Sequence, residues 1–278
     1  MNLFSSPELT ARYESLKSYF FKYKDSGICI AYSGGVDSTL LLKAAVDAVS
    51  DFSSSVLAVI LETQLHPHSD TEHAVRLARE LGANPAVITV DEFQNPEILK
   101  NPRNRCYLCK HLLFSQLKEL ALSRGYHAIF DGTNKDDENQ YRPGMKVLEE
   151  LQIKSPLREL GITKEQVRSI SAMVGLSTAS VPSTPCLATR LPYGAYLDRE
   201  LLQRIHQGEA YLRDLEFYNV RLRYHEPVLR IEINCSEFEQ LIARKEEVIS
   251  AMKKLHFPYI TLDLEGFRSG SMDLNETS

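Results

Sequence analysis

The stretch that most constrains the fold is residues 29–44, which read CIAYSGGVDSTLLLKA. The apolar residues up to Tyr32 predict a short buried strand, and the run from Ser38 predicts a helix. Gly34 and Gly35 stand between them, where glycine admits backbone conformations closed to other residues. A helix that starts directly after a parallel strand turns its N–H groups and its positive dipole end toward the carboxyl edge of the sheet. We therefore expect an anion-binding loop here.

Strand and helix patterns alternate through the first two thirds of the chain. Short apolar runs predict strands at 28–32, 55–62, 85–90 and 127–133, with a weaker candidate at 152–157. Helical spacing of apolar residues fills the intervals, and Thr163–Gln166 is a capping box that opens one of these helices. This order is typical of βαβ units. We predict an α/β fold with a parallel twisted sheet and helices on both of its faces.

The pattern changes near residues 179–194, ASVPSTPCLATRLPYG, whose proline, serine and threonine content indicates a loop or linker. Beyond it the predicted elements follow in αββαβ order, with strands at 220–224, 228–233 and 259–264. The second helix of this region is expected to begin at a Ser236–Glu239 cap. We predict two domains, a larger one at 1–182 and a smaller α+β domain at 183–278.

The loop order Ser33-Gly34-Gly35-Val36-Asp37-Ser38 resembles the SGGxDS loop of the ATP pyrophosphatase (PP-loop) family, and it lacks the lysine of a Walker loop. The resemblance implies an adenine nucleotide alpha hydrolase-like fold that holds the pyrophosphate of ATP, with Asp37 placed to position Mg²⁺. Enzymes of that family split ATP into AMP and pyrophosphate and so activate a substrate oxygen as an adenylate. The candidate ATP ligands are Ser33, Gly34, Gly35, Asp37, Ser38 and Gly132.

Asp131, Gly132 and Thr133 follow the fourth predicted strand, so they fall at the same carboxyl edge as the glycine loop. Residues 136–138 continue this loop as Asp-Asp-Glu, whose oxygens suit Mg²⁺ or ribose hydroxyls. Solvated acidic loops are common, so the residue pattern alone leaves such a role open.

Further stretches resemble the LarE family over nearly the whole chain. They are DGTNKDDENQYRPG at 131–144, TPCLATRLPYG at 184–194, and VRLRYHE at 220–226 with TLDLEGFRSGSM at 261–272. LarE-type enzymes are ATP-dependent sulfur transferases that help to make the nickel-pincer nucleotide cofactor of lactate racemase. The resemblance implies that a carboxylate of a pyridinium dicarboxylate mononucleotide is adenylated and then receives sulfur as a thiocarboxylate.

The LarE resemblance also implies roles for single residues. Cys186 matches the family cysteine that supplies or carries sulfur, and the nearby Arg190 favours its thiolate. Arg221 and Arg223 alternate with apolar residues, so they share one face of a strand, where two guanidiniums can grip a phosphate. Together with Arg190 and Glu209 they are the candidate substrate contacts. Without the resemblance, an inert thiol and a solvated strand face are the plainer interpretations.

The stretch RNRCYLCKHLLF holds Cys106 and Cys109 at the expected start of a helix. The residues alone fit a thioredoxin-type pair, half of a zinc site completed by His111 or His127, or two buried thiols without a role. With Cys186, the pair resembles the iron–sulfur branch of the LarE family, in which three thiolates hold a [4Fe–4S] cluster that carries hydrosulfide. Members without the CxxC give up the sulfur of their single cysteine instead. The candidate catalytic residues are Asp37, Cys106, Cys109 and Cys186.

The charge composition of the chain limits the classes of molecule that it is expected to bind. A formal net charge of −5 and a pI near 5.9 argue against a surface built for nucleic acid, which disfavours the alternative of a tRNA-thiolating PP-loop enzyme. A non-catalytic ATP-binding regulator is a second alternative. No apolar run approaches the ~20 residues of a membrane helix, and the start of the chain has no secretory pattern, so we expect a cytoplasmic protein. The expected partners are a small nucleotide, a sulfur source and further copies of the chain. Cys29 and Cys235 are interpreted as core fillers.

Overall fold

The computed structural model describes residues 6–50, 56–66, 68–139, 144–180 and 186–268. Contacts divide the chain into two compact units, which are described separately. The first unit runs to Asp91 and resumes from Asn104 to Thr184, and the second comprises Glu92–Arg103 and the chain from Pro185 onward. The segment 92–103 therefore packs with C-terminal residues, whereas the sequence pattern assigns it to the first domain.

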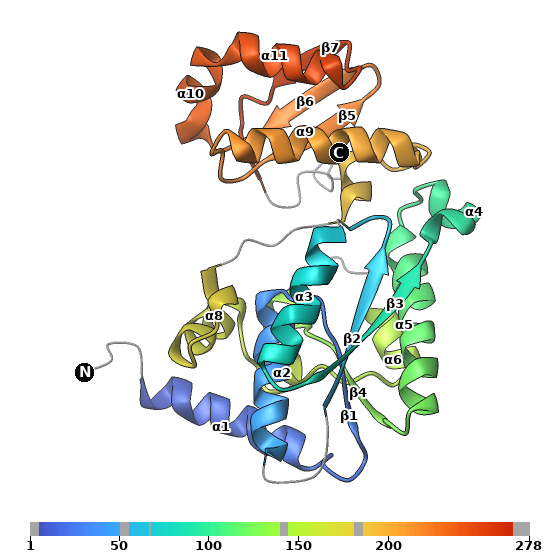
Figure 1. Ribbon diagram of the computed structural model, residues 1–278, viewed down its shortest axis with the longest axis vertical. Helices are drawn as coiled ribbons and strands as arrows, with labels where there is room; N and C mark the ends of the chain where they lie inside the picture. The colour runs from blue at the N-terminus through green and yellow to red at the C-terminus, as the bar shows by residue number, and fades with distance from the viewer. Residues whose placement is uncertain (1–5, 51–55, 67, 140–143, 181–185, 269–278) are drawn as a thin grey trace. The chain divides into compact units, whose positions relative to one another are not determined.

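The first unit is a four-stranded parallel sheet in the order β3-β2-β1-β4, flanked by helices (Figure 1). Its strands are β1 (Ile28–Ala31), β2 (Val56–Thr63), β3 (Asn84–Val90) and β4 (Ala128–Phe130). Its helices are α1 (Pro7–Phe21), α2 (Val36–Val49), α3 (His68–Glu80), α5 (Arg105–Ser123), α6 (Met145–Glu150), α7 (Pro156–Glu159) and α8 (Lys164–Met173). The predicted α/β class is confirmed.

Successive residues of the central strand enter two different cores, as the alternation of side chains along a strand requires. Ile28 and Ile30 pack with residues of α1, α2 and α8. Cys29 and Val59 pack instead with Phe114 and its neighbours on α5. Both faces of the sheet are therefore covered, which explains why its strands read as continuous apolar runs.

The weaker fifth strand predicted at 152–157 is reduced to a single bridge between Phe130 and Lys154. Pro156 has no backbone N–H to offer a neighbouring strand, and it opens the short helix α7 instead. The predicted capping box at the start of α8 is present, with the Thr163 hydroxyl accepting from the backbone N–H of Gln166.

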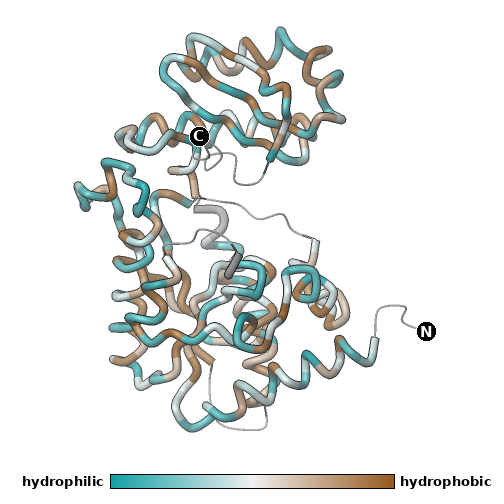
Figure 2. The backbone as a smooth tube through the Cα atoms, turned by 180° about the vertical axis from the view of Figure 1, so that it is seen from behind, coloured by the Kyte–Doolittle hydropathy of each residue, from teal (hydrophilic) through white to brown (hydrophobic). Residues whose placement is uncertain are grey.

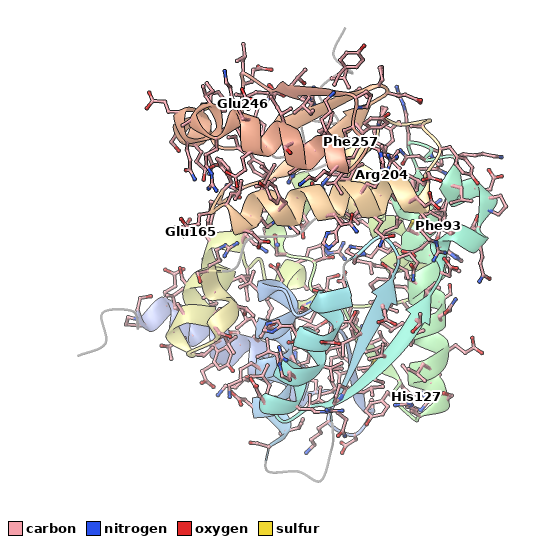
Figure 3. All side chains as sticks on the ribbon, turned by 45° about the horizontal axis from the view of Figure 1, so that its top comes forward. Phe93, His127, Glu165, Arg204, Glu246 and Phe257 are labelled. Carbon is pink, nitrogen blue, oxygen red and sulfur yellow. The ribbon has the colours of Figure 1, made fainter. Side chains whose placement is uncertain are left out.

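The second unit is built on a three-stranded sheet in the order β5-β6-β7, in which β5 and β6 are antiparallel and β6 and β7 are parallel. Its elements are α4 (Pro96–Leu99), α9 (Arg199–Asp214), β5 (Arg221–His225), β6 (Val228–Glu232), α10 (Phe238–Ala243), α11 (Lys245–Lys254) and β7 (Tyr259–Leu262). Apolar and polar residues alternate along its helices (Figure 2), as expected of helices that cover one face of a sheet. Arg204 of α9 lies over the ring of Phe257, with its guanidinium carbon 5.4 Å from the ring centroid (Figure 3). The predicted Ser236 cap is displaced, since the capping box pairs Asn234 with Glu237.

The segment 92–103 is held to the second unit by specific contacts. The side-chain amide of Asn101 donates to the carbonyl of Pro192 at 2.8 Å. The guanidinium carbon of Arg199 lies over the ring of Phe93, 4.8 Å from its centroid. Within the described ranges, no helix is both long enough and apolar enough to span a membrane.

Candidate functional site

The glycine loop joins β1 to α2, as predicted. Gly34 has φ of 74°, in the left-handed region that favours glycine, and a Cβ there would lie 3.1 Å from the Cβ of Ala74. The Ser33 hydroxyl lies 3.1 Å from that of Ser38 and accepts from the N–H of Gly35 at 3.3 Å. Gly35 is the N-cap of α2 and has no side chain to satisfy the first N–H groups of that helix. The loop is therefore suited to an anion with phosphate oxygens.

The end of β4 lies against this loop. A Cβ added to Gly132 would lie 3.2 Å from the backbone nitrogen of Ser38 and 3.3 Å from the Cβ of Asp37, so glycine permits the close approach. Asp131 is buried, and its carboxylate accepts from the hydroxyls of Thr133 and Ser155, each at 2.6 Å. These bonds hold the strand end that brings Gly132 to the glycine loop.

Both oxygens of the Asp37 carboxylate have partners. Oδ1 accepts from the side-chain amide of Asn134 at 3.1 Å, and Oδ2 forms an ion pair with the ammonium of Lys164. The backbone N–H of Lys164 donates to Oδ2 of Asp136 at 2.8 Å. The Asp37 side chain is 20% exposed, so a ligand can reach it. The sequence identified Asp37 and missed Lys164, because no local pattern links residues so far apart.

Carboxylate oxygens beside a phosphate loop fit Mg²⁺, which commonly takes one or two carboxylates and completes its shell with water and phosphate oxygens. Across the described residues, no three His, Cys, Asp or Glu side chains lie close enough together to hold a metal by themselves. Asp37 would therefore share such an ion with a bound nucleotide.

Cys106 and Cys109 lie in the first turns of α5, three residues apart and hence on one side of the helix. Cys106 is exposed and Cys109 is partly buried. The guanidinium of Arg105 donates to the sulfur of Cys106 at 3.6 Å. Lys110, the residue after Cys109, donates to Oδ2 of Asp131 at 3.2 Å. This ion pair joins the CxxC helix to the strand end that contacts the glycine loop.

Cys186 belongs to the second unit, where it is partly buried and directly precedes a 3-10 turn at Leu187–Arg190. The first unit thus holds two of the three predicted cluster ligands. Two thiols on one side of a helix fit a pair of iron–sulfur ligands, which are ordinarily cysteine thiolates.

Arg190 and Glu209 form a buried bidentate pair in the second unit, with each side chain 1% exposed. Nε of Arg190 lies 2.6 Å from Oε1 of Glu209, and Nη2 lies 3.0 Å from Oε2. The same carboxylate accepts from the backbone N–H of Leu222 and from Arg213, each at 3.0 Å. The pair thereby links the 3-10 turn after Cys186, helix α9 and strand β5.

Arg221 and Arg223 lie two residues apart on β5, as predicted. Nε of Arg223 donates to Glu232 at 3.0 Å, and both of these side chains are buried. Arg221 is only partly buried and stacks on Phe267, with its guanidinium carbon 4.5 Å from the ring centroid. Burial, followed by repulsion from Arg223 and Arg190, lowers the pKa of Arg221 to about 10. Arg221 is still charged at neutral pH, so an anion beside it would be stabilised.

Comparison with known proteins identifies the family. Residues 8–100 match the NAD synthase family. Over 246 residues, the chain is 35% identical to the pyridinium-3,5-bisthiocarboxylic acid mononucleotide synthase of Lactiplantibacillus plantarum, and the match covers 88% of each protein. The chain belongs to this synthase family, LarE. The family predicted from the motifs is confirmed, as is the prediction of an ATP-dependent enzyme with a PP-loop fold.

Other matches agree with membership of the LarE family. An uncharacterized protein from Synechocystis sp. is 38% identical over 267 residues, which cover 95% of this chain and 98% of that protein. The structure of NMN synthetase from Francisella tularensis superimposes with a TM-score of 0.50 at 15% identity, covering 72% of this chain and 86% of that one. The latter likeness shows a shared fold.

Proposed function

We propose that this LarE protein uses ATP to adenylate a carboxylate of a pyridinium dicarboxylate mononucleotide and then inserts sulfur to give a thiocarboxylate, as a step of nickel-pincer nucleotide synthesis. The observation that carries the proposal is the meeting of a phosphate loop and a CxxC helix within the first unit. Lys110 beside Cys109 pairs with Asp131, and the next residue, Gly132, abuts Asp37. The residues proposed for activation and two of the three cysteines proposed for sulfur delivery therefore belong to the same unit.

In the activation step, a carboxylate oxygen of the substrate attacks the α-phosphorus of ATP, and the bond to the pyrophosphate oxygen breaks. We assign pyrophosphate binding to the loop from Ser33 to Ser38 together with Gly132, because the start of α2 offers N–H groups and a positive dipole end there. Asp37 would position Mg²⁺ on the phosphates. Stabilising the charge that develops on the leaving pyrophosphate is the main contribution such a loop can make.

In the sulfur step, a sulfur nucleophile attacks the acyl carbon of the adenylate, and the bond to the AMP oxygen breaks. We assign sulfur handling to Cys106, Cys109 and Cys186, the three thiols that the family resemblance implies as ligands of a [4Fe–4S] cluster. When bound, the cluster would supply hydrosulfide. The guanidinium of Arg105 contacts the sulfur of Cys106 at 3.6 Å and would help to orient that ligand.

Among the candidate substrate contacts, we assign the phosphate of the mononucleotide to Arg221. It is the partly exposed member of the arginine group, and its charge is repelled by two buried arginine neighbours. Arg190 and Arg223 would not contact the substrate directly, since their side chains are 1% exposed and paired with Glu209 and Glu232. An anion at Arg221 would offset the repulsion among the three guanidiniums.

The activation step is tested by Asp37→Asn, with Asp47→Asn on the same helix as the matched control. With ATP, Mg²⁺ and the pyridinium dicarboxylate mononucleotide, the Asp37 variant should form no AMP, whereas the control should form it at the wild-type rate. Far-UV circular dichroism checks that both variants fold. Unchanged AMP release by the Asp37 variant would refute the assignment, and wild-type protein that binds ATP without releasing pyrophosphate would indicate a regulator instead.

The sulfur step is tested by iron analysis of anaerobically purified protein. We expect bound iron and a broad charge-transfer band near ~400 nm, typical of protein-bound iron–sulfur clusters, and we expect Cys106→Ser to lose both. Active protein without iron, from which Cys186 loses its sulfur during turnover as shown by mass spectrometry, would replace the cluster by a sacrificial cysteine. Filter binding of bulk tRNA at moderate salt would favour the tRNA-thiolating alternative.

A further inference from the structure

The ion pair between Lys164 and Asp37 joins two sequence-distant parts of the first unit at the proposed metal position. Lys164 is the first residue of α8, and Asp37 lies in the first turn of α2. Their side chains are 33% and 20% exposed, so the pair borders solvent and a ligand can compete for it. The ammonium of Lys164 donates to Oδ2 of Asp37, while Oδ1 accepts a hydrogen bond from the side-chain amide of Asn134.

The backbone around Lys164 is fixed independently of its side chain. Its N–H donates to Asp136 at 2.8 Å, and Thr163 with Gln166 forms the capping box of α8. The start of the helix is therefore held in place while the four-carbon side chain can change direction. A lysine with an anchored backbone and a side chain that is one third exposed can exchange one anionic partner for another at little structural cost.

A metal ion on Asp37 and an ammonium on the same carboxylate oxygen exclude each other, because two cations cannot share that position without strong repulsion. We propose that Lys164 neutralises Asp37 in the nucleotide-free enzyme, that Mg²⁺ displaces it when Mg²⁺–ATP binds, and that the released ammonium then contacts the phosphates. This inference rests on the proposed ATP site and adds a residue that the motifs do not contain. Lys164 would supply, from a different element, the charge that a Walker loop carries on its own lysine.

The exchange predicts opposite effects of one substitution on two ligands. Without its ammonium competitor, Lys164→Met should bind metal alone more tightly, by about twofold to fivefold, the range expected from a partly exposed ion pair. The same variant should bind metal-bound nucleotide more weakly, because a phosphate contact is lost. A residue with a purely structural role would weaken both or change neither.

The probes are Mn²⁺, whose free concentration is read by electron paramagnetic resonance, and α,β-methylene ATP, which cannot be split to AMP, titrated with Mg²⁺ present. Lys43→Met is the matched control, since Lys43 lies on α2 in an ion pair with Asp47 in which both side chains are 30% exposed. We expect this control to bind both probes like the wild type, and Lys164→Arg to restore most of the nucleotide affinity. Circular dichroism confirms folding, which the intact backbone contacts of residue 164 should preserve.

The exchange would be overturned if Lys164→Met bound Mn²⁺ as the wild type does or more weakly. The proposed ATP site would still stand in that case, provided that Asp37→Asn lost binding of both Mn²⁺ and the analogue. Unchanged binding of the analogue by Lys164→Met would also overturn it. If Asp37→Asn binds both probes like the wild type, the proposed site and the exchange are both wrong.

Discussion

Replacing Glu209 by glutamine should destabilise the second unit strongly, although it changes only one charge. The carboxylate of Glu209 accepts two bonds from Arg190, one from Arg213 and one from the N–H of Leu222. Glutamine keeps the shape but is neutral, and its amide group turns donors toward guanidinium donors. Arg190 would then keep its charge at 1% exposure with a weakened partner. Removing one member of a buried ion pair costs about 3–5 kcal/mol.

Urea unfolding followed by far-UV circular dichroism measures this cost. With a slope of about 2 kcal/mol per M urea, the midpoint should fall by about 1.5–2.5 M. The matched control is Glu97→Gln, because Glu97 pairs with Lys100 at 2.7 Å in the same unit and both side chains are 64% exposed. An exposed pair of this kind contributes less than about 1 kcal/mol, so the control midpoint should barely move.

A Glu209→Gln midpoint close to that of the control would refute the reasoning. If the variant at the same time lost affinity for the mononucleotide, Glu209 would contact the substrate, as the motif resemblance alone implies. A large loss of stability with substrate affinity retained under native conditions would show that Glu209 stabilises the second unit through the buried pair and does not contact the substrate.

Three further outcomes test other parts of the structure. Burial raises the pKa of the Cys29 thiol to about 12, so iodoacetamide at pH 8 should leave Cys29 unmodified while it alkylates the exposed Cys106, as read by peptide mass spectrometry. Burial, followed by repulsion from Arg230, lowers the pKa of His225, so the folded protein resists protonation of this residue and loses stability as the pH falls below about 6.5. The variant His225→Gln should therefore show a smaller decline in urea midpoint between about pH 6.5 and 5 than the wild type. An equal decline in both proteins would contradict this. Gly34→Ala places a Cβ at φ of 74°, a strain of about 1–2 kcal/mol, and should weaken binding of α,β-methylene ATP in a calorimetric titration, which equal affinity would disprove.

The sheet of the first unit was predictable because its physical cause is local. A strand that is covered on both faces must be apolar at consecutive positions, and that run is visible without any knowledge of its neighbours. The segment 152–157 contains a similar run, but Pro156 removes a backbone donor and the chain makes one bridge before turning into α7. The excursion of 92–103 into the second unit was not predictable, because it depends on contacts such as that of Asn101 with Pro192, 91 residues apart.

In the candidate site too, some features follow from local sequence and topology, and others depend on contacts between distant residues. The placement of Gly132 beside Asp37 follows from parallel topology, since the carboxyl ends of neighbouring strands meet at one edge. The partner of Asp37 does not follow from it, because Lys164 is 127 residues away and reaches the loop only through the packing of α8.

The spacing of residues along the sequence does not predict which charged groups will pair with one another in a site. Alternation along β5 places Arg221 and Arg223 on one face whether they bind a substrate or a neighbouring strand. For Arg223 the partner is a neighbouring strand, because Nε of Arg223 donates to the carboxylate of Glu232 on β6 at 3.0 Å and its charge is neutralised there. Arg190 is neutralised in the same way by Glu209, on a different element 19 residues further along. Arg221 is the residue left with a partly exposed and poorly compensated charge. That difference in neutralisation, rather than the motif shared by all three arginines, is the physical reason to assign the substrate phosphate to it.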